Sequence, residues 1–335
     1  MDDNVIEIKN LKKTYKTYKR GVGFKEAIKS LFKRNVVYSD ALKGINFQIK
    51  RGEIVGFVGP NGAGKSTAIK IMTSILHPSS GEAKVLGFVP YQKRKKYVKH
   101  IGAVFGQKSQ IWWDLPSVDS FYLNKGIYNI PTKDFDERLS ELSKLLKIEE
   151  IMLRPARNLS LGERMKCELV MALLHNPEVL FLDEPTIGVD ALSKEEIREF
   201  LQKINKKFKT TIILTTHDMD DIEELCERLI IIDSGIIIYD GDLDNIKNYL
   251  KCKTVDFEIA KITNKKEFDL LLKKGEILAN TKWFKSVQFN KDKVNVPDVI
   301  NKLMKCADII DLTIRDPKLE HIIKEIYTQG NVDKK

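Results

Sequence analysis

One run of consecutive residues has the types and spacing needed to hold a triphosphate. It consists of Gly59, Pro60, Asn61, Gly62, Ala63, Gly64, Lys65, Ser66 and Thr67. It matches G-x-x-x-x-G-K-[ST] at every fixed position. Glycines are required because backbone N–H groups can surround phosphates only where no Cβ blocks the approach. The lysine would reach the β- and γ-phosphates, and the Ser66 hydroxyl would ligate Mg²⁺. The pattern predicts a nucleoside-triphosphate site.

The sequence on either side of this run supports the same interpretation. Ile54–Val58 enters it as a short apolar strand, and Ala68–Met72 leaves it with helical character. Strand, glycine-rich loop and helix are the context that the motif requires. The alternative is a plain glycine-rich turn between a strand and a helix, which would not need every fixed position of the motif.

Two further apolar runs end in residues that could perform hydrolysis. Val179–Asp183 is a predicted buried strand that places Asp183 at its carboxyl end, where open α/β sheets bind ligands. Asp183 would hold Mg²⁺, and Glu184 could face the attacking water as general base. Thr211–Thr215 is another predicted buried strand, and His217 just beyond it could sense the γ-phosphate. A surface histidine in a turn is the alternative for His217.

Ser160 and Glu163 match the S/T-x-x-E pattern of a capping box. They open an apolar-periodic segment that runs from Met165 to Leu174. The simplest interpretation is a well-capped helix. A capped helix N-terminus that contains Gly162 would in addition be an anion site, because its N–H groups point outward.

Composition limits the class of protein. The chain has 335 residues, enough for one large and one small domain, and a net charge of +10. This surplus suits a nucleotide, a nucleic acid or an anionic membrane surface without choosing among them. No stretch approaches the roughly 18 apolar residues that cross a bilayer, and no secretion signal opens the chain, so we expect a cytosolic protein. The four cysteines form no CxxC and are expected to be reduced packing residues.

Taken in order, these motifs resemble the ATP-binding subunit of an ATP-binding cassette (ABC) transporter. The resemblance covers roughly residues 4–245 and rests on Gly59–Thr67, Gln107, Leu159–Glu163, Val179–Glu184, Asp190 and His217. It implies ATP and Mg²⁺ as cofactors. Gln107 would touch Mg²⁺ and the attacking water. Asp190 would lie at an interface between two subunits, and Tyr15, with Tyr18 as a substitute, resembles the aromatic that stacks on adenine.

The resemblance also implies partners. Two copies, or one copy and a similar ATPase, would pair head to tail on binding ATP. Each nucleotide would lie between residues 59–66 of one copy and Ser160–Gly162 of the other. A separate integral-membrane permease would be the second partner, which places the chain on the cytoplasmic face of the cell membrane. No nucleic acid is expected as a partner.

One segment departs from the family pattern. The usual Leu-Ser-Gly-Gly-Gln signature is here Leu159-Ser160-Leu161-Gly162-Glu163. Ser160 and Gly162 are retained, but Leu161 replaces a glycine and Glu163 adds a negative charge near the triphosphate. We expect the capping box to resolve the conflict, with the Glu163 side chain turned back to the Ser160 N–H.

The amino-acid sequences of three segments narrow the resemblance to one subgroup of the family. They are residues 106–116, 159–169 and 217–222, and they look like the daunorubicin- and viologen-resistance type of exporter ATPase. The prediction is therefore an ATP hydrolase that energises export through a separate permease. Import is a closer alternative than a soluble ABC ATPase acting on nucleic acid or ribosomes. No long coiled coil and no second cassette supports that soluble alternative.

The fold expected is α/β: a P-loop NTPase of the ABC type in residues 1–245, plus a small accessory domain in 246–335. The first would combine a parallel sheet, an antiparallel β subdomain and a helical signature subdomain at about 108–175. A basic amphipathic insertion is expected at about 19–38, either against the chain's own core or against a membrane or partner. The accessory domain is expected to be α+β, with a ferredoxin-like arrangement as one option. Trp112 and Trp113 could dock on a membrane partner or fill a core.

Overall fold

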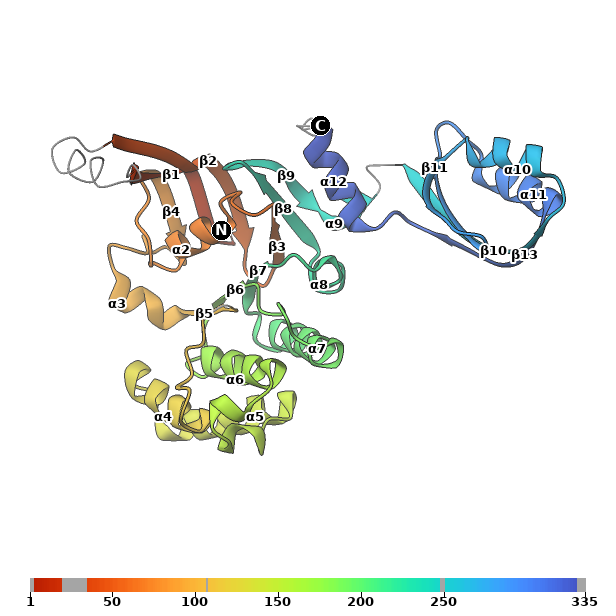
Figure 1. Ribbon diagram of the computed structural model, residues 1–335. Helices are drawn as coiled ribbons and strands as arrows, with labels where there is room; N and C mark the ends of the chain where they lie inside the picture. The colour runs from red at the N-terminus through yellow and green to blue at the C-terminus, as the bar shows by residue number, and fades with distance from the viewer. Residues whose placement is uncertain (1–2, 20–34, 107, 248–250, 330–335) are drawn as a thin grey trace, which may run out of the picture. The chain divides into compact units, whose positions relative to one another are not determined.

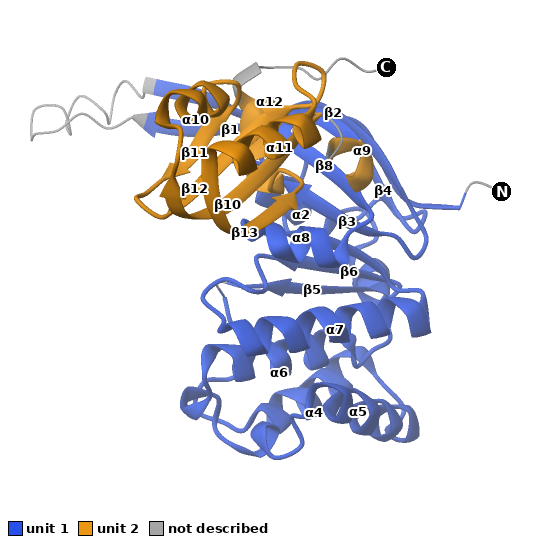
Figure 2. Ribbon diagram, turned by 90° about the vertical axis from the view of Figure 1, so that its right-hand side faces the viewer, with its two compact units in different colours: residues 1–240 blue, residues 241–335 orange. Residues whose placement is uncertain are grey.

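The computed structural model describes residues 3–19, 35–106, 108–247 and 251–329. It divides into two compact units, Met1–Asp240 and Gly241–Lys335, which Figure 2 draws in blue and orange. Each unit is described by itself.

The first unit is built on a six-stranded sheet in the order β5-β6-β7-β3-β8-β9. The strands are β3 (Ile54–Val58), β5 (Ile101–Phe105), β6 (Val179–Asp183), β7 (Thr211–Thr215), β8 (Arg228–Asp233) and β9 (Ile236–Asp242). The pairs β5/β6, β6/β7, β7/β3 and β3/β8 are parallel. Their near-continuous apolar runs are typical of strands buried on both faces. The carboxyl ends of β3, β6 and β7 therefore meet at one edge, where the predicted site residues lie.

A second sheet of this unit is antiparallel, in the order β2-β1-β4. Its strands are β1 (Asn4–Lys19), β2 (Asn35–Lys50) and β4 (Ser80–Val85). The expected insertion at 19–38 falls mostly on residues 20–34, which lie outside the described part of the chain. The described ends of the insertion belong to the paired strands β1 and β2, with Lys19 opposite Asn35.

Helices complete the first unit. They are α2 (Lys65–Met72), α3 (Arg94–Tyr97), α4 (Ser117–Tyr128), α5 (Thr132–Leu146), α6 (Leu161–Leu173), α7 (Ala191–Phe208) and α8 (Met219–Leu225). Short 3-10 turns occupy Val98–His100, Ile151–Leu153 and Ala156–Asn158. Figure 1 shows α4, α5 and α6 gathered beside one another. The amphipathic pattern of α5 is confirmed, since Phe135, Leu139, Leu142 and Leu146 are buried.

The second unit contains α9 (Leu243–Lys247), β10 (Cys252–Ile262), α10 (Lys265–Leu272), β11 (Glu276–Asn280), β12 (Phe284–Asn290), α11 (Val296–Cys306), β13 (Ala307–Arg315) and α12 (Leu319–Gln329). Its antiparallel strands follow the order β11-β12-β10-β13. The helices α10 and α11 cover one face of the sheet (Figure 1). This βαββαβ succession is the ferredoxin-like arrangement. The sequence did not predict β11, because its side chains are half-buried or exposed.

No helix within the described ranges is both long enough and apolar enough to cross a membrane.

Candidate functional site

The predicted phosphate loop joins β3 to α2 as the motif requires. Gly64 is the N-cap of α2 with φ 114°, a left-handed conformation that glycine adopts without steric cost. A Cβ on Gly59 would stand 2.2 Å from the carbonyl oxygen of Ile232, so the loop can lie this close to β8 only as glycine. No side chain caps the first N–H groups of α2. These groups are therefore available to an anion.

The side chain of Lys65 lies within the phosphate loop. Its side chain is buried, and Nζ donates to the carbonyl oxygens of Gly59 at 2.5 Å and Pro60 at 3.2 Å. Burial lowers the pKa of Lys65, while the nearby Glu184 and Asp183 carboxylates act in the opposite direction. The ammonium thus sits between the loop carbonyls and the carboxylates at the end of β6.

Asp183 and Ser66 come together across the sheet edge. The Ser66 hydroxyl donates to Asp183 Oδ1 at 3.2 Å, and the Thr215 hydroxyl donates to the same oxygen at 2.6 Å. A hydroxyl beside a carboxylate is an oxygen donor set that suits Mg²⁺, which takes few protein ligands when substrate phosphates supply others. No group of three His, Cys, Asp or Glu side chains among the described residues could hold a metal by itself. The residues present therefore fit an ion shared with a nucleotide.

Glu184 and His217 also meet, with His217 Nε2 2.9 Å from Glu184 Oε1. The backbone N–H of Glu184 donates to the Thr215 carbonyl at 2.9 Å and to its hydroxyl at 3.2 Å. Glu184 has φ 57°, a left-handed backbone that is unusual for a residue with a long side chain. The hydrogen bonds to Thr215 on β7 fix the backbone of Glu184. Its carboxylate is therefore held next to His217.

Gln107 lies outside the described residues, but its neighbour Gly106 is informative. The Gly106 N–H donates to the Asp183 carbonyl at 2.9 Å. A Cβ on Gly106 would stand 2.1 Å from the Glu184 carbonyl oxygen. The end of β5 is therefore pressed against the two acidic residues at the end of β6, which only glycine permits.

Tyr15 lies beside the phosphate loop. Its hydroxyl is 3.4 Å from the hydroxyl of Thr67, the last residue of the motif. Tyr18, the substitute considered from the sequence, is 52% exposed. Tyr15 thus lies at the C-terminal end of the motif.

The capping box at the start of α6 is confirmed. Glu163 N–H donates to the Ser160 hydroxyl at 3.1 Å, and Ser160 N–H donates to Glu163 Oε2 at 2.8 Å. Arg154 binds the other carboxylate oxygen at 2.5 Å. Burial opposes ionisation of Glu163, but the Ser160 and Arg154 hydrogen bonds outweigh it and lower the pKa of this carboxyl. Both oxygens thus face the chain's own donors, as expected from the sequence.

The signature segment packs on the loop that carries Asp190. A Cβ on Gly162 would stand 2.5 Å from the Ser193 hydroxyl and 3.0 Å from Asp190 Oδ2. Asp190 caps α7 by accepting from Ser193 N–H at 3.0 Å, and this bond lowers the pKa of the Asp190 carboxyl. A Cβ on Gly188 would stand 3.1 Å from Leu161 Cδ2, so Leu161 lies over this loop. The sequence did not predict this packing.

The phosphate loop and the signature segment remain separate within one chain. Between described residues, no hydrogen bond or ion pair connects residues 59–67 to residues 160–163. One copy therefore brings together its phosphate loop, Asp183, Glu184 and His217, but not its own signature segment.

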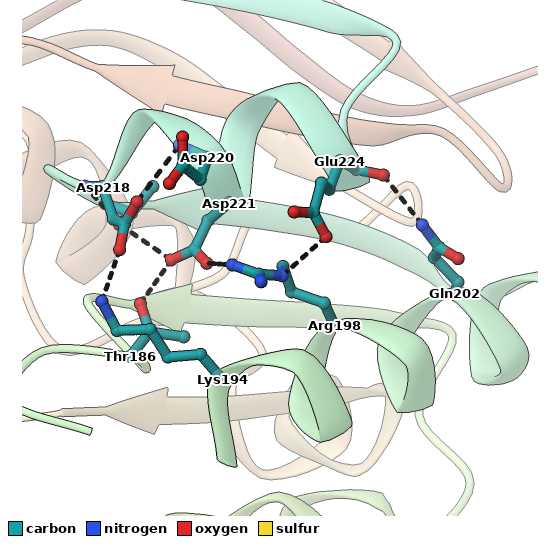
Figure 3. Close-up of polar contacts among 9 residues, drawn as sticks. Thr186, Lys194, Arg198, Gln202, Asp218, Asp220, Asp221 and Glu224 are labelled. Carbon is teal, nitrogen blue, oxygen red and sulfur yellow. Dashed lines mark hydrogen bonds and ion pairs between the residues drawn. The ribbon is translucent and has the colours of Figure 1, made fainter. Parts of the chain in front are cut away.

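The buried carboxylate of Asp221 on α8 links two loops of the site to α7, and sequence reasoning missed it. Asp221 has no exposed surface and accepts from Thr186 at 2.5 Å, Thr216 at 3.3 Å and Arg198 at 3.1 Å (Figure 3). Thr186 follows Glu184 closely, Thr216 precedes His217, and Arg198 lies on α7. Figure 3 also shows Arg198 paired with Glu224, at 2.8 Å. The acidic run from 218 to 221 gave no sign of which carboxylate points inward.

Comparisons with known proteins point to one family. A family model described as ABC transporter matches residues 42–187. The chain is 32% identical over 206 residues to the ABC transporter ATP-binding protein NatA of Bacillus subtilis, covering 62% of this chain and 83% of that protein. It is 37% identical over 205 residues to the probable multidrug ABC transporter ATP-binding protein YbhF of Escherichia coli, covering 61% of this chain but only 35% of YbhF.

Solved structures show the same fold. One is cbiO1 from Clostridium perfringens, part of the ABC transporter complex cbiONQ, with TM-score 0.59, 29% identity and coverage of 73% of this chain and 90% of that chain. Another is a dimeric ATP-binding cassette in a post-hydrolysis state bound to ADP and Pi, with TM-score 0.57, 27% identity and coverage of 71% and 98%. The chain belongs to the ATP-binding proteins of ABC transporters and is an ATPase.

Proposed function

We propose that the chain energises a separate membrane permease of the daunorubicin/viologen-resistance type, which exports its cargo. The amino-acid sequences of residues 106–116, 159–169 and 217–222 support this subgroup. Two relatives bear names compatible with export: YbhF is a probable multidrug transporter protein, and the Bacillus licheniformis relative, 28% identical, is the bacitracin transport protein BcrA.

In this proposal the phosphate loop and Asp183 bind ATP with Mg²⁺. Lys65 exchanges its contacts with the loop carbonyls for the β- and γ-phosphates. Ser66 and Asp183, whose oxygens already converge, hold the ion. When bound, Mg²⁺ would neutralise charge on the phosphates. Tyr15 lies close enough to Thr67 to stack on the adenine of the same nucleotide.

Glu184 is the proposed general base. Its carboxylate would accept a proton from the water that attacks the γ-phosphate. His217, 2.9 Å away, would orient that carboxylate and contact the phosphate. Gln107 would touch the ion and the water, a role assigned by family resemblance because this residue lies outside the described structure.

The observation that carries the proposal is the separation of the phosphate loop from the signature segment in one chain. A second copy placed head to tail would bring its signature segment, Ser160–Glu163, beside the first copy's ATP. Ser160 and Gly162 would contact the γ-phosphate, while the Glu163 carboxylate stays turned to its own helix. Asp190 would lie at the same interface, because it packs against Gly162. A related cassette is dimeric, which supports pairing of two copies here.

An exposed apolar surface near α4 is the proposed permease contact. Trp112 is 55% exposed and Trp113 is 52% exposed, so neither fills a core. Other large apolar side chains exposed in this subdomain are Leu115, Tyr122, Leu123, Ile127 and Leu153. Contiguous exposed apolar residues commonly mark partner contacts. Docking there would hold the chain peripherally on the cytoplasmic face of the membrane.

We assign the ATP-binding function to residues 1–245 and an accessory role to residues 246–335. The second unit has its own buried core, formed by β10, β12, α10 and α11. None of the proposed ATP-binding residues lies in it.

The test is a pull-down from native membranes with Glu184→Gln, which should trap the ATP-bound pair. Lys65→Ala, which weakens phosphate binding, is the matched control. Mass spectrometry should find a polytopic membrane protein with Glu184→Gln and ATP, and less of it with Lys65→Ala. Recovery of ribosomal or DNA-bound proteins without a permease would replace transport with the soluble alternative.

Direction needs a second assay, because a methionine import protein of Enterococcus faecalis is also 30% identical over 242 residues. The permease recovered above would be reconstituted with the chain in inside-out vesicles. ATP-dependent uptake of cargo into these vesicles supports export, and ATP-dependent loss of preloaded cargo indicates import.

A further inference from the structure

A buried carboxylate on the signature helix contacts the segment that follows residue 107. Glu168 is 3% exposed and lies on α6, which begins at the capping box of Ser160. Its Oε1 accepts from the Ser109 hydroxyl at 2.5 Å and from the backbone N–H groups of Gln110 at 2.7 Å and Ile111 at 3.3 Å. One oxygen atom thus fixes three consecutive residues.

Burying the Glu168 carboxylate costs free energy, which indicates that its contact with residues 109–111 is specific. Burial raises the pKa of Glu168, although the Ser109 hydroxyl, the Gln110 and Ile111 amides and the charge of Arg164 favour the ionised form. The other oxygen, Oε2, is buried without a hydrogen-bond partner. A buried acid with an unsatisfied oxygen destabilises a fold unless its other contacts compensate.

The described residues before and after position 107 are both bound to other elements. On the N-terminal side, Gly106 is bound to the Asp183 carbonyl and lies against the Glu184 carbonyl. On the C-terminal side, Glu168 binds residues 109–111. The two anchored ends bracket residue 107, which is proposed to touch the reacting water.

We propose that Glu168 is a positioning residue that ties the signature helix to the segment 109–111. Through this tie, a movement of α6 when Ser160 meets the partner's ATP is passed to residues 109–111, which follow closely after the residue proposed to touch the reacting water. The inference rests on the proposed function, because it uses the proposed roles of Ser160 and Gln107. It assigns Glu168 to turnover and not to the first binding of ATP, since its hydrogen bonds among the described residues go to Ser109, Gln110 and Ile111 and not to the phosphate loop.

The test compares Glu168→Ala with Glu168→Gln in the full chain. Glutamine keeps one carbonyl oxygen that can accept the same three donors, whereas alanine keeps none. We expect Glu168→Ala to lower kcat for ATP at least about tenfold with KM within about threefold, and Glu168→Gln to restore most of kcat. Hydrogen exchange of the peptide that covers residues 106–116 should be faster in Glu168→Ala and close to the parent in Glu168→Gln.

Cys167→Ala is the control for general packing. Cys167 is adjacent on α6 and fully buried, but has no hydrogen bond with residues 109–111. It should lower the melting temperature without lowering kcat or changing exchange in 106–116. Equal loss of kcat in Cys167→Ala and Glu168→Ala would overturn the proposal, as would unchanged kcat or unchanged exchange in Glu168→Ala. No permease is needed, so failure here is distinct from failure of the membrane pull-down.

Discussion

Glu163→Gln distinguishes a capping role from a phosphate-contacting role for the unusual acid of the signature. The carboxylate uses one oxygen for the Ser160 N–H at 2.8 Å and the other for Arg154 at 2.5 Å. Glutamine has a single carbonyl oxygen, so it can keep the capping bond but loses the ion pair. The pair is partly exposed and is worth about 0.2–1 kcal/mol. This corresponds to a decrease in melting temperature of at most about 4 °C.

The Glu163→Gln change should have little effect on ATP binding or hydrolysis, because the carboxylate of Glu163 faces its own helix. We expect kcat and KM for ATP to change by less than about twofold in steady-state hydrolysis. Glu163→Ala is the matched comparison: it also removes the capping bond, and should cost about 1 kcal/mol more. If Glu163→Gln instead tightened ATP binding about tenfold or raised turnover, the carboxylate would be acting on phosphate and the reasoning would be refuted.

The same variant has a defined pH dependence. The pKa of Glu163 is lowered in the folded chain, because the Ser160 and Arg154 hydrogen bonds outweigh the effect of burial. A lowered pKa stabilises the fold fully above the unfolded-state pKa, about 4.3, and this contribution disappears as the pH falls through the folded value. The difference in melting temperature between the parent and Glu163→Gln should be constant between about pH 6 and 8 and shrink below about pH 4.3. A difference that grows on acidification would contradict this assignment.

Three other outcomes are expected. Gly162→Ala should cost about 1–3 kcal/mol of stability in thermal melts, because its Cβ would stand 2.5 Å from a serine hydroxyl of α7; Gly126→Ala in α4, where a Cβ meets nothing within 4 Å, should not destabilise. Asp221→Asn should cost about 1–3 kcal/mol in urea unfolding, because it removes the buried charge that binds Thr186 and Arg198, although Glu224 remains as a partner of that arginine. Exposed Asp220→Asn should be near neutral. Cys167 should resist iodoacetamide at pH 8 in the folded chain, as followed by mass spectrometry, because burial raises the pKa of its thiol to about 11.

The parts of the site that sequence could predict are those whose contacts are local or occur at strand ends. The capping box joins residues one helical turn apart, so its pattern is visible in the chain. The positions of Asp183 and His217 follow from buried strands, because the carboxyl ends of parallel strands share one edge. The ferredoxin-like order of the second unit was an option because its helices and most strands have clear apolar periodicity.

The parts that sequence could not predict depend on contacts between distant residues. Gly162 meets Ser193, and Leu161 lies over Gly188, because two loops far apart in the chain pack together. Glu168 is one acid among many on a helix, and only the fold shows that it points inward. Strand β11 was missed because an exposed edge strand carries few apolar side chains.

At Glu184, the residue type that suits the left-handed backbone differs from the residue type that the proposed reaction needs. With φ 57°, a residue bearing a Cβ costs roughly 1 kcal/mol or more relative to glycine in the same conformation. Glu184→Gly should therefore relieve that strain while removing the proposed general base. A library of variants selected only for thermal resistance would enrich this inactive protein. Selection for ATP hydrolysis would instead retain glutamate at position 184, although its backbone conformation there is strained.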